Sequence, residues 1–306
     1  MPMLILLAAF GFVAQLVDGS LGMGYGVTST SLLVAVGVAP AAASAAVNFA
    51  QLGTTLASGV SHHSMGNVDW RTVSILAAPG FVGAFGGAFF LVSLSTEVAI
   101  PTVATILLVL GTYVFLRFLL LGGRRLTFHG SPSPLFLVPM GLVGGMVNSI
   151  GGGGWGPIGT TTLLSSGRLE PRKVVGSIST TEFGVTVGGS LGFLFALGTE
   201  EVPWSYTLAL LIGGVIAAPF AAYLVRYLAP RVLGVAAGGM IILTNTRTLL
   251  TNADVAGQTI GLVLGALAVA WVAAIVVTVR QVRAERRAAA AEPTVDTAEP
   301  EVDPVA

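Results

Sequence analysis

Long apolar runs separated by short polar stretches fill the chain from its first residues to about position 280. A helix needs about 20 mostly apolar residues to cross a bilayer, so the longer runs predict membrane-spanning helices. The runs fall at about 3–17, 27–38, 42–61, 72–93, 98–121, 135–147, 158–166, 174–197, 204–227, 230–250 and 257–279. The pattern predicts an all-α polytopic membrane protein.

Two glycine-rich stretches interrupt this pattern, at residues 18–30 and 148–160. Glycine and proline disfavour a helix interior by about 1 and 3 kcal/mol relative to alanine, so a continuous helix is not expected through either stretch. The flanking apolar runs are too short to span, namely 3–17, 27–38, 135–147 and 158–166. Each pair of runs is therefore predicted to form a re-entrant hairpin. Such backbone is tolerated at membrane depth only where it is buried in protein or lines a wet cavity.

The two stretches belong to two related halves of the chain. Residues 11–37 align with residues 141–167 at a constant offset of 130 positions, as in Gly11 and Gly141. Further along, Asn48 aligns with Glu182 at an offset of 134. Matching breaks in two halves are a sequence pointer to a transporter binding site.

Basic residues, which concentrate in cytoplasmic loops, predict how the halves sit. The basic loop 168–173 is cytoplasmic, like the other basic loops, only if 135–166 is a hairpin. Each half then has one hairpin and three spans, and this odd number inverts the second half. The predicted organisation is a first membrane repeat at 1–121, a cytoplasmic linker at 122–134, a second repeat at 135–252, an added span at 253–281 and a disordered acidic tail at 282–306. The chain is expected in the plasma membrane, with its C-terminus in the cytoplasm.

Composition narrows the function classes. Charged residues make up 9% of the chain, against about 25% in soluble domains, and the formal net charge of zero gives no argument for nucleic acid. No cysteine is present, which excludes thiolate chemistry. The second glycine-rich stretch lacks the lysine of a phosphate-binding loop. His62 and His63 are adjacent and are interpreted as cytoplasmic interface residues, so neither a metal nor a cofactor is predicted.

Several motifs together resemble the sulfite exporter TauE/SafE family of membrane permeases. They are the doubled glycine-rich hairpin, the loop at residues 67–70, the small-residue stretch at residues 83–87 and the Val-Gly-Ser that precedes Glu182. The resemblance covers about residues 1–250. It implies a secondary carrier of small sulfur-containing or organic anions such as sulfite, thiosulfate or sulfoacetate.

The glycine-rich hairpins are the leading candidate for the binding site. Backbone N–H groups converge in such turns, and a half-helix that follows directs its positive end at a bound anion. The candidate substrate-binding residues are Gly22, Gly24, Gly26, Thr28, Thr30, Asn148, Gly152, Gly154, Gly156, Thr160 and Thr161. If the hairpins enter from opposite faces, their tips meet near the midplane. The alternative is that the glycines only allow close helix packing.

Two carboxyl groups fall within apolar segments, at Asp18 and Glu182. Intramembrane carboxyl groups are costly and are functional by default. Burial favours the protonated form of a carboxyl group, which suits a proton carrier, so both are candidates for proton coupling. Their repeat partners are amides, because Asn148 matches Asp18 and Asn48 matches Glu182. Asn48 and Gln51 are predicted to support the site, and a purely structural acid is the alternative.

The sequence thus favours a secondary transporter of a small anion, with two inverted repeats and one extra C-terminal helix, and no enzyme activity. A passive anion channel needs the same pore without a titrating group. A non-transporting scaffold or an intramembrane enzyme is the remaining alternative. The expected partners are the small anion and the lipid bilayer, and the sequence leaves the oligomeric state open.

Overall fold

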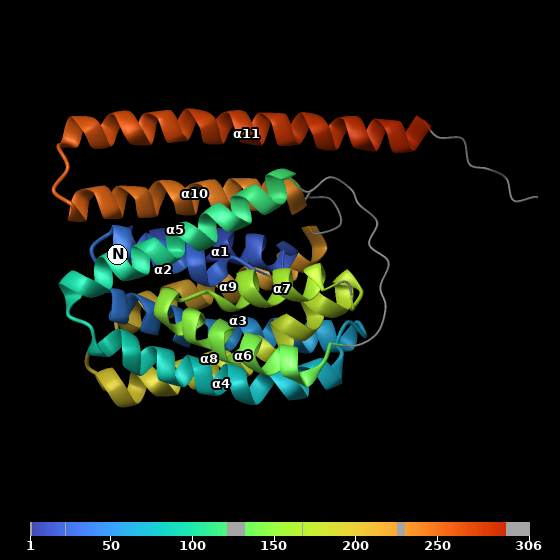
Figure 1. Ribbon diagram of the computed structural model, residues 1–306, viewed down its shortest axis with the longest axis horizontal. Helices are drawn as coiled ribbons and strands as arrows, with labels where there is room; N and C mark the ends of the chain where they lie inside the picture. The colour runs from blue at the N-terminus through green and yellow to red at the C-terminus, as the bar shows by residue number, and fades with distance from the viewer. Residues whose placement is uncertain (1, 22, 121–131, 167, 225–229, 292–306) are drawn as a thin grey trace, which may run out of the picture.

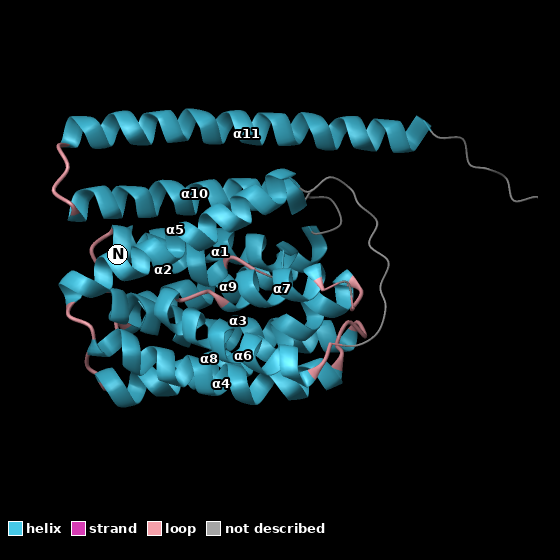
Figure 2. Cartoon of the chain, viewed as in Figure 1, coloured by secondary structure: helices cyan, strands magenta, loops and turns pink. Residues whose placement is uncertain are grey.

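The computed structural model describes residues 2–21, 23–120, 132–166, 168–224 and 230–291. These residues form α-helices and the loops that join them, so the all-α prediction is confirmed (Figure 2). The helices are α1 (Pro2–Leu21), α2 (Tyr25–Ala35), α3 (Pro40–Ser64), α4 (Trp70–Ser93), α5 (Thr96–Leu120), α6 (Pro134–Gly151), α7 (Trp155–Ser165), α8 (Pro171–Leu197), α9 (Trp204–Leu224), α10 (Pro230–Asn252) and α11 (Gly257–Ala291).

Helices suited to crossing a membrane occur throughout the bundle. Within the described residues, α1, α4, α5, α6, α8 and α11 are long and apolar enough to span. Most helices lie roughly along one common direction (Figure 1). The chain is therefore a multi-pass membrane protein.

Each predicted hairpin consists of a long helix followed by a short one. α1 has 20 residues and α6 has 18, whereas α2 and α7 have 11 each. At 1.5 Å per residue, α1 and α6 are about 30 and 27 Å long. The prediction that all four arms are too short to span was wrong for these two, because each helix continues through Asp18 or Asn148 into the glycine-rich stretch. α6 ends where Gly152 adopts a left-handed conformation, with φ of 70°.

The two halves of the chain pack against each other reciprocally. α1, the first helix of the first half, packs on α9, and α6 packs on α4 in the corresponding way. α3 lies against α8, and α5 lies against α10, so each of these helices contacts its own counterpart. The sequence repeat is thus accompanied by a matched set of helix contacts.

Glycines allow the closest of these contacts. A Cβ atom at Gly83 or Gly87 on α4 would overlap the backbone of α6. In the other half, a Cβ atom at Gly213 on α9 would overlap the backbone of α1 at Ala8. Small residues at helix interfaces let backbones approach closely in membrane bundles, and here they secure the contact between the halves.

A cavity lies at each end of the bundle, and the two ends are named after a residue in each. At the Gly37 end, Gly37, Thr96 and Asn252 line a cavity between α2, α3, α5 and α10. At the Asn67 end, Asn67 and His62 line a smaller cavity between α1, α3 and α9. α2 ends at the Gly37 end, and α7 ends beside the start of α8 near Asn67.

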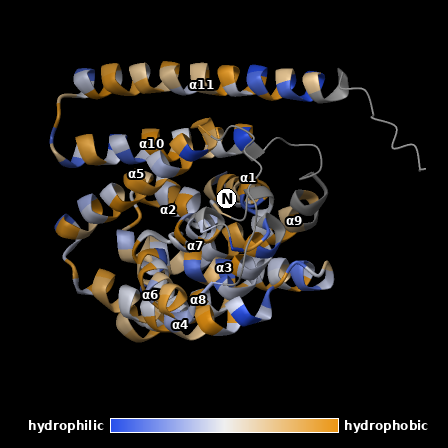
Figure 3. Cartoon of the chain, turned by 45° about the vertical axis from the view of Figure 1, so that its right-hand side comes forward, coloured by the Kyte–Doolittle hydropathy of each residue, from blue (hydrophilic) through white to orange (hydrophobic). Residues whose placement is uncertain are grey.

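α11 lies on the outside of the bundle against α10 (Figure 1). It continues to Ala291, beyond the predicted end of the last span at 281, because its final residues are mostly alanine, arginine and glutamate, which are good helix formers. Hydrophilic residues gather in this C-terminal part (Figure 3). An ion pair of 2.8 Å joins Glu285 to Arg231 of α10. Linker residues 122–131 and tail residues 292–306 lie outside the described part of the chain.

Candidate functional site

The tips of the two hairpins touch each other inside the bundle. The first tip is residues 23–26 and the second is residues 152–155. A Cβ atom on Gly26 would overlap the backbone of Gly152 and Gly153, and one on Gly152 would overlap the hydroxyl of Thr30. No side chain fits between the two backbones, so glycine is required at this crossing.

One hydrogen bond closes each tip, and the two bonds are equivalent. The backbone N–H of Tyr25, at the start of α2, donates to Asp18 Oδ1 at 3.2 Å. The backbone N–H of Trp155, at the start of α7, donates to Asn148 Oδ1 at 3.1 Å. In each hairpin the long helix supplies an oxygen that satisfies an unpaired donor of the short helix. Asp18 and Asn148, aligned in the sequence, therefore have the same structural role.

The aromatic residues of the tips fill space beneath them. Tyr25 and Trp155 are both 1% exposed or less. The Tyr25 hydroxyl donates to the carbonyl of Leu210 at 2.9 Å, and Trp155 Nε1 donates to the carbonyl of Ile178 at 3.1 Å. Each aromatic side chain thus fixes its tip to a helix of the second half.

Hydroxyl groups of α2 line the region behind the first tip. Thr28, Ser29, Thr30 and Ser31 are all buried. Thr28 donates to the carbonyl of Gly24, and Ser31 to that of Val27. The hydroxyls of Ser29 and Thr30 have no hydrogen-bond partner among the described residues. Of the two, Thr30 is the one in contact with the second tip.

A set of buried polar side chains joins the tips to α3 and α8. Asn148 Nδ2 donates to Asn48 Oδ1 at 3.5 Å, and Gln51 Nε2 donates to Glu182 Oε1 at 3.2 Å. The Ser44 hydroxyl donates to the carbonyl of Ser149. We call this set the central polar cluster, and its members are Thr30, Ser44, Asn48, Gln51, Asn148, Ser149 and Glu182.

Several cluster atoms have unused hydrogen-bonding capacity. Thr30 Oγ1, Gln51 Oε1 and Ser149 Oγ have no partner among the described residues. A buried polar group without a partner costs about 1–3 kcal/mol. A water molecule or an ion bound in the site would satisfy such groups.

The predicted site residues divide into those that meet and those that do not. The structure brings together Gly26, Thr30 and Gly152, and it joins Asn48 to Asn148 and Gln51 to Glu182.

The remaining candidates serve the tips less directly. Gly24 has a φ of 128°, which favours glycine. A Cβ atom on Gly154 would crowd Val147 and Asn148. Gly156 and Thr160 are buried in α7, whereas Gly22 and the side chain of Thr161 lie outside the described part of the structure.

Asp18 lies on α1 and Glu182 lies on α8. Each is bound by a neutral partner, Asp18 by a backbone N–H and Glu182 by an amide. Glu182 is buried, whereas Asp18 is half-buried.

The adjacent histidines point to different surroundings. His62 lines the cavity at the Asn67 end. The His63 ring lies 5.3 Å from the Trp70 ring, edge to face. The two histidine side chains thus point in different directions, as expected for adjacent residues.

Sequence reasoning missed three parts of this region. Ser44 and Ser149 join α3 to the second hairpin, and Asn245 of α10 donates to Ser31 Oγ at 2.8 Å. Arg247 lines the cavity at the Gly37 end. Asn245 and Arg247 lie inside an apolar run, and this position was the signal available in the sequence.

A multi-pass bundle with two touching glycine-rich hairpins around buried polar groups has the architecture of a membrane transporter. Residues 7–248 match the family described as "Sulfite exporter TauE/SafE", and the chain belongs to this family. The chain is also 47% identical over 281 residues to "Probable membrane transporter protein YtnM" of Bacillus subtilis (strain 168), covering 90% of this chain and 92% of that protein. No solved structure matches the chain significantly. The predictions of the family, and of a membrane transporter and not an enzyme, are confirmed.

Proposed function

We propose that the protein is a secondary transporter that binds a small anion, such as sulfite or sulfoacetate, where the two hairpin tips meet. The observation that carries this proposal is the contact of Gly26 with Gly152 beside the hydroxyls of Thr30 and Ser149, which have no hydrogen-bond partner in the described part of the chain. The N-terminal ends of α2 and α7 begin at the same tips. Helix N-termini and neutral hydroxyls stabilise an anion without placing a fixed cation in the membrane.

We propose further that a proton accompanies the anion. Asp18 accepts a hydrogen bond at the N-terminal end of α2, where the anion would bind. Two negative charges a few ångströms apart repel each other by about 4 kcal/mol or more at the effective dielectric constant of a protein. Anion binding therefore favours the protonated form of Asp18, and Glu182 adds to this effect. Proton and anion bind together in this scheme and cross in the same direction.

Calorimetric titration of the purified protein with sulfoacetate tests the proton coupling. The heat of binding, measured in two buffers with different ionisation enthalpies, should show an uptake of about one proton per anion bound. In proteoliposomes, Asp18→Asn should keep anion exchange and lose accumulation driven by a pH gradient, and Glu182→Gln should weaken this accumulation. Proton release on binding would overturn the scheme. Flux that never saturates, without gradient-driven accumulation in the unmodified protein, would favour a passive channel instead.

We also propose that the two halves are inverted and that the Asn67 end faces the cytoplasm. The reciprocal helix contacts support the inversion. The basic residues Lys173 and Arg231 lie toward the Asn67 end, and Lys173 donates to the carbonyl of Gly66 at 2.8 Å. Single cysteines at positions 66 and 200 of this cysteine-free chain should react with impermeant reagents from the cytoplasmic and outer sides of the plasma membrane, respectively. Labelling of both from one side contradicts the orientation.

A further inference from the structure

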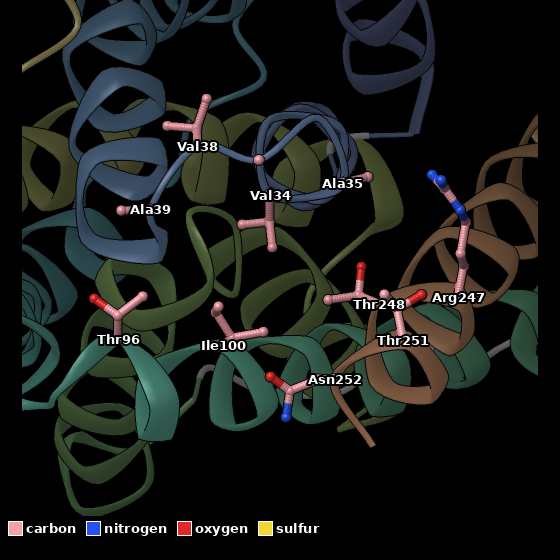
Figure 4. Close-up of a pocket in the computed structure, with 11 residues that line it drawn as sticks. Val34, Ala35, Val38, Ala39, Thr96, Ile100, Arg247, Thr248, Thr251 and Asn252 are labelled. Atoms are coloured by element: carbon pink, nitrogen blue, oxygen red, sulfur yellow. The ribbon is translucent and has the colours of Figure 1, made fainter. Parts of the chain in front are cut away.

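The cavity at the Gly37 end has the size and lining of a second ligand site. Its volume is about 310 Å³, which is at the lower end of the range for small-molecule sites. It lies between the end of α2, the start of α3, the start of α5 and the last two turns of α10 (Figure 4). The lining residues that carry polar side chains are Thr96, Arg247, Thr248, Thr251 and Asn252.

These polar groups are available to a ligand. Thr248 donates to the carbonyl of Thr244. The structure shows no hydrogen bond or ion pair from the side chains of Arg247, Thr251 or Asn252 to any described residue. A guanidinium group offers five N–H donors in a planar fork, an arrangement that matches the oxygens of an oxyanion. Within the described part of the chain, the cavity therefore combines a guanidinium group that forms no ion pair with neutral hydroxyl and amide groups.

Arg247 lies at the Gly37 end of the bundle, away from the other basic residues that the structure describes. In the described part of the chain, the other basic residues lie at the helix ends toward Asn67 or on the C-terminal part of α11. Glu97 and Asp254 lie at the Gly37 end beside the start of α5 and the end of α10. In the described part of the chain, Arg247 is therefore the basic residue that can attract an anion at this end.

The helix α2 connects the first hairpin tip, where it begins, with the cavity, where it ends. Val34 of α2 lines the cavity, and Ser31 is one turn deeper on the same helix. Asn245, less than one turn deeper than Arg247 on α10, donates to Ser31 Oγ at 2.8 Å. Ser31 is next to Thr30, which contacts the second tip. Ser31 and Asn245 are thus hydrogen-bonded polar side chains of α2 and α10 that lie between the cavity and the central polar cluster.

We propose that this cavity is a vestibular site for small oxyanions, in which Arg247 captures the anion before it passes Ser31 and Asn245 to the tips. The inference rests on the proposed transport function. It adds a residue that selects anions by charge and that lies outside the central polar cluster.

Chemical modification tests the site without relying on transport. In the cysteine-free chain, Thr251→Cys places a thiol in the cavity. A negatively charged methanethiosulfonate should modify it several-fold faster than a positively charged one, because Arg247 raises the local concentration of anions. Adding Arg247→Gln should remove this preference, and sulfoacetate should protect the thiol only while Arg247 is present. Equal preference with and without Arg247 would overturn the proposal.

Transport kinetics give the second measurement. Arg247→Gln should raise the KM for sulfoacetate about tenfold at low ionic strength and leave kcat nearly unchanged. Arg247→Lys should recover part of the loss. Arg280→Gln, which removes an exposed charge from the outer helix, is the matched control and should change neither constant. An unchanged KM in Arg247→Gln overturns the vestibular site alone, whereas a failure of the unmodified protein to bind or carry any oxyanion overturns the proposed function as well.

Discussion

The two hairpins have the same backbone arrangement and different chemistry. In both, the oxygen of a side chain on the long helix accepts the first N–H of the short helix, at 3.2 Å in one and 3.1 Å in the other. The oxygen belongs to a carboxyl group at Asp18 and to an amide at Asn148. Because an amide closes the second tip equally well, the fold does not require an acid at this position. The acid of the first hairpin is thus free to serve another purpose, which we propose is proton coupling.

The helices α3 and α8, which pack behind the hairpins, also differ in their polar residues, and here the acid lies in the second half. α3 carries a stripe of polar residues at helical spacing, namely Ser44, Asn48, Gln51, Thr55, Ser58 and His62. The positions of α8 that align with them are Ile178, Glu182, Val185, Gly189, Gly192 and Ala196. The stripe on α3 runs from the central polar cluster to the cavity at the Asn67 end, where Ser58 and His62 line the wall. Of these six positions on α8, Glu182 alone carries a polar side chain.

The comparison shows that the repeat supplies the scaffold, and we propose that the differences between the halves supply the function. Each half contributes one acid and one amide, and the acids lie on different elements. The polar side chains toward the two ends also lie on different helices, with α3 toward the Asn67 end and α2 with α10 toward the Gly37 end.

The largest effect is expected from a substitution that blocks the contact between the two hairpin tips. Gly26→Ala places a methyl group where the backbone of Gly152 and Gly153 already lies, so the tips must separate. Transport in proteoliposomes should be lost, and the melting temperature should fall. Gly86→Ala is the control, because a Cβ atom there meets open space and alanine favours the helix. Full transport by Gly26→Ala would mean that the tips do not form the site.

Much of this contact could be predicted from the sequence. The glycine-rich breaks and the constant offset between the halves predicted paired hairpins and the equivalence of Asp18 with Asn148. The positions of the breaks were less predictable, because helices α1 and α6 tolerate glycine where they are buried against neighbouring helices. Long-range pairs such as Asn48 with Asn148, and Gln51 with Glu182, depend on tertiary packing. Periodicity alone could not reveal them.

Substitutions that exchange the acid and the amide at the two hairpin tips should have the next largest effect. Asp18→Asn gives both tips an amide, so the hydrogen bond to Tyr25 is kept and the titrating group is lost. This variant should fold, bind sulfoacetate and take up fewer protons on binding than the unmodified protein. Asn148→Asp adds a negative charge beside Asn48 and should weaken anion binding, because an ionised acid repels the anion and no longer donates to Asn48.

The same two-buffer titration measures both variants, and the double variant restores one acid to the pair of tips. If Asp18→Asn takes up as many protons as the unmodified protein, Asp18 is not the coupling group and Glu182 alone remains. If Asn148→Asp binds the anion as well as before, the second tip does not contact it.

The smallest effects are expected from the aromatic residues of the tips, and they should be unequal. Tyr25→Phe removes only the hydroxyl that donates to the carbonyl of Leu210, and a hydrogen bond of this kind contributes about 0.5–1.5 kcal/mol to stability. Trp155→Phe removes a similar hydrogen bond and also opens a cavity, because the indole packs closely against Gly80 and Gly144. Thermal unfolding in detergent should therefore show a larger drop in melting temperature for Trp155→Phe, with transport retained by Tyr25→Phe. Equal losses would show that packing under the second tip adds nothing beyond the hydrogen bond, and the hairpins would then be alike in this respect too.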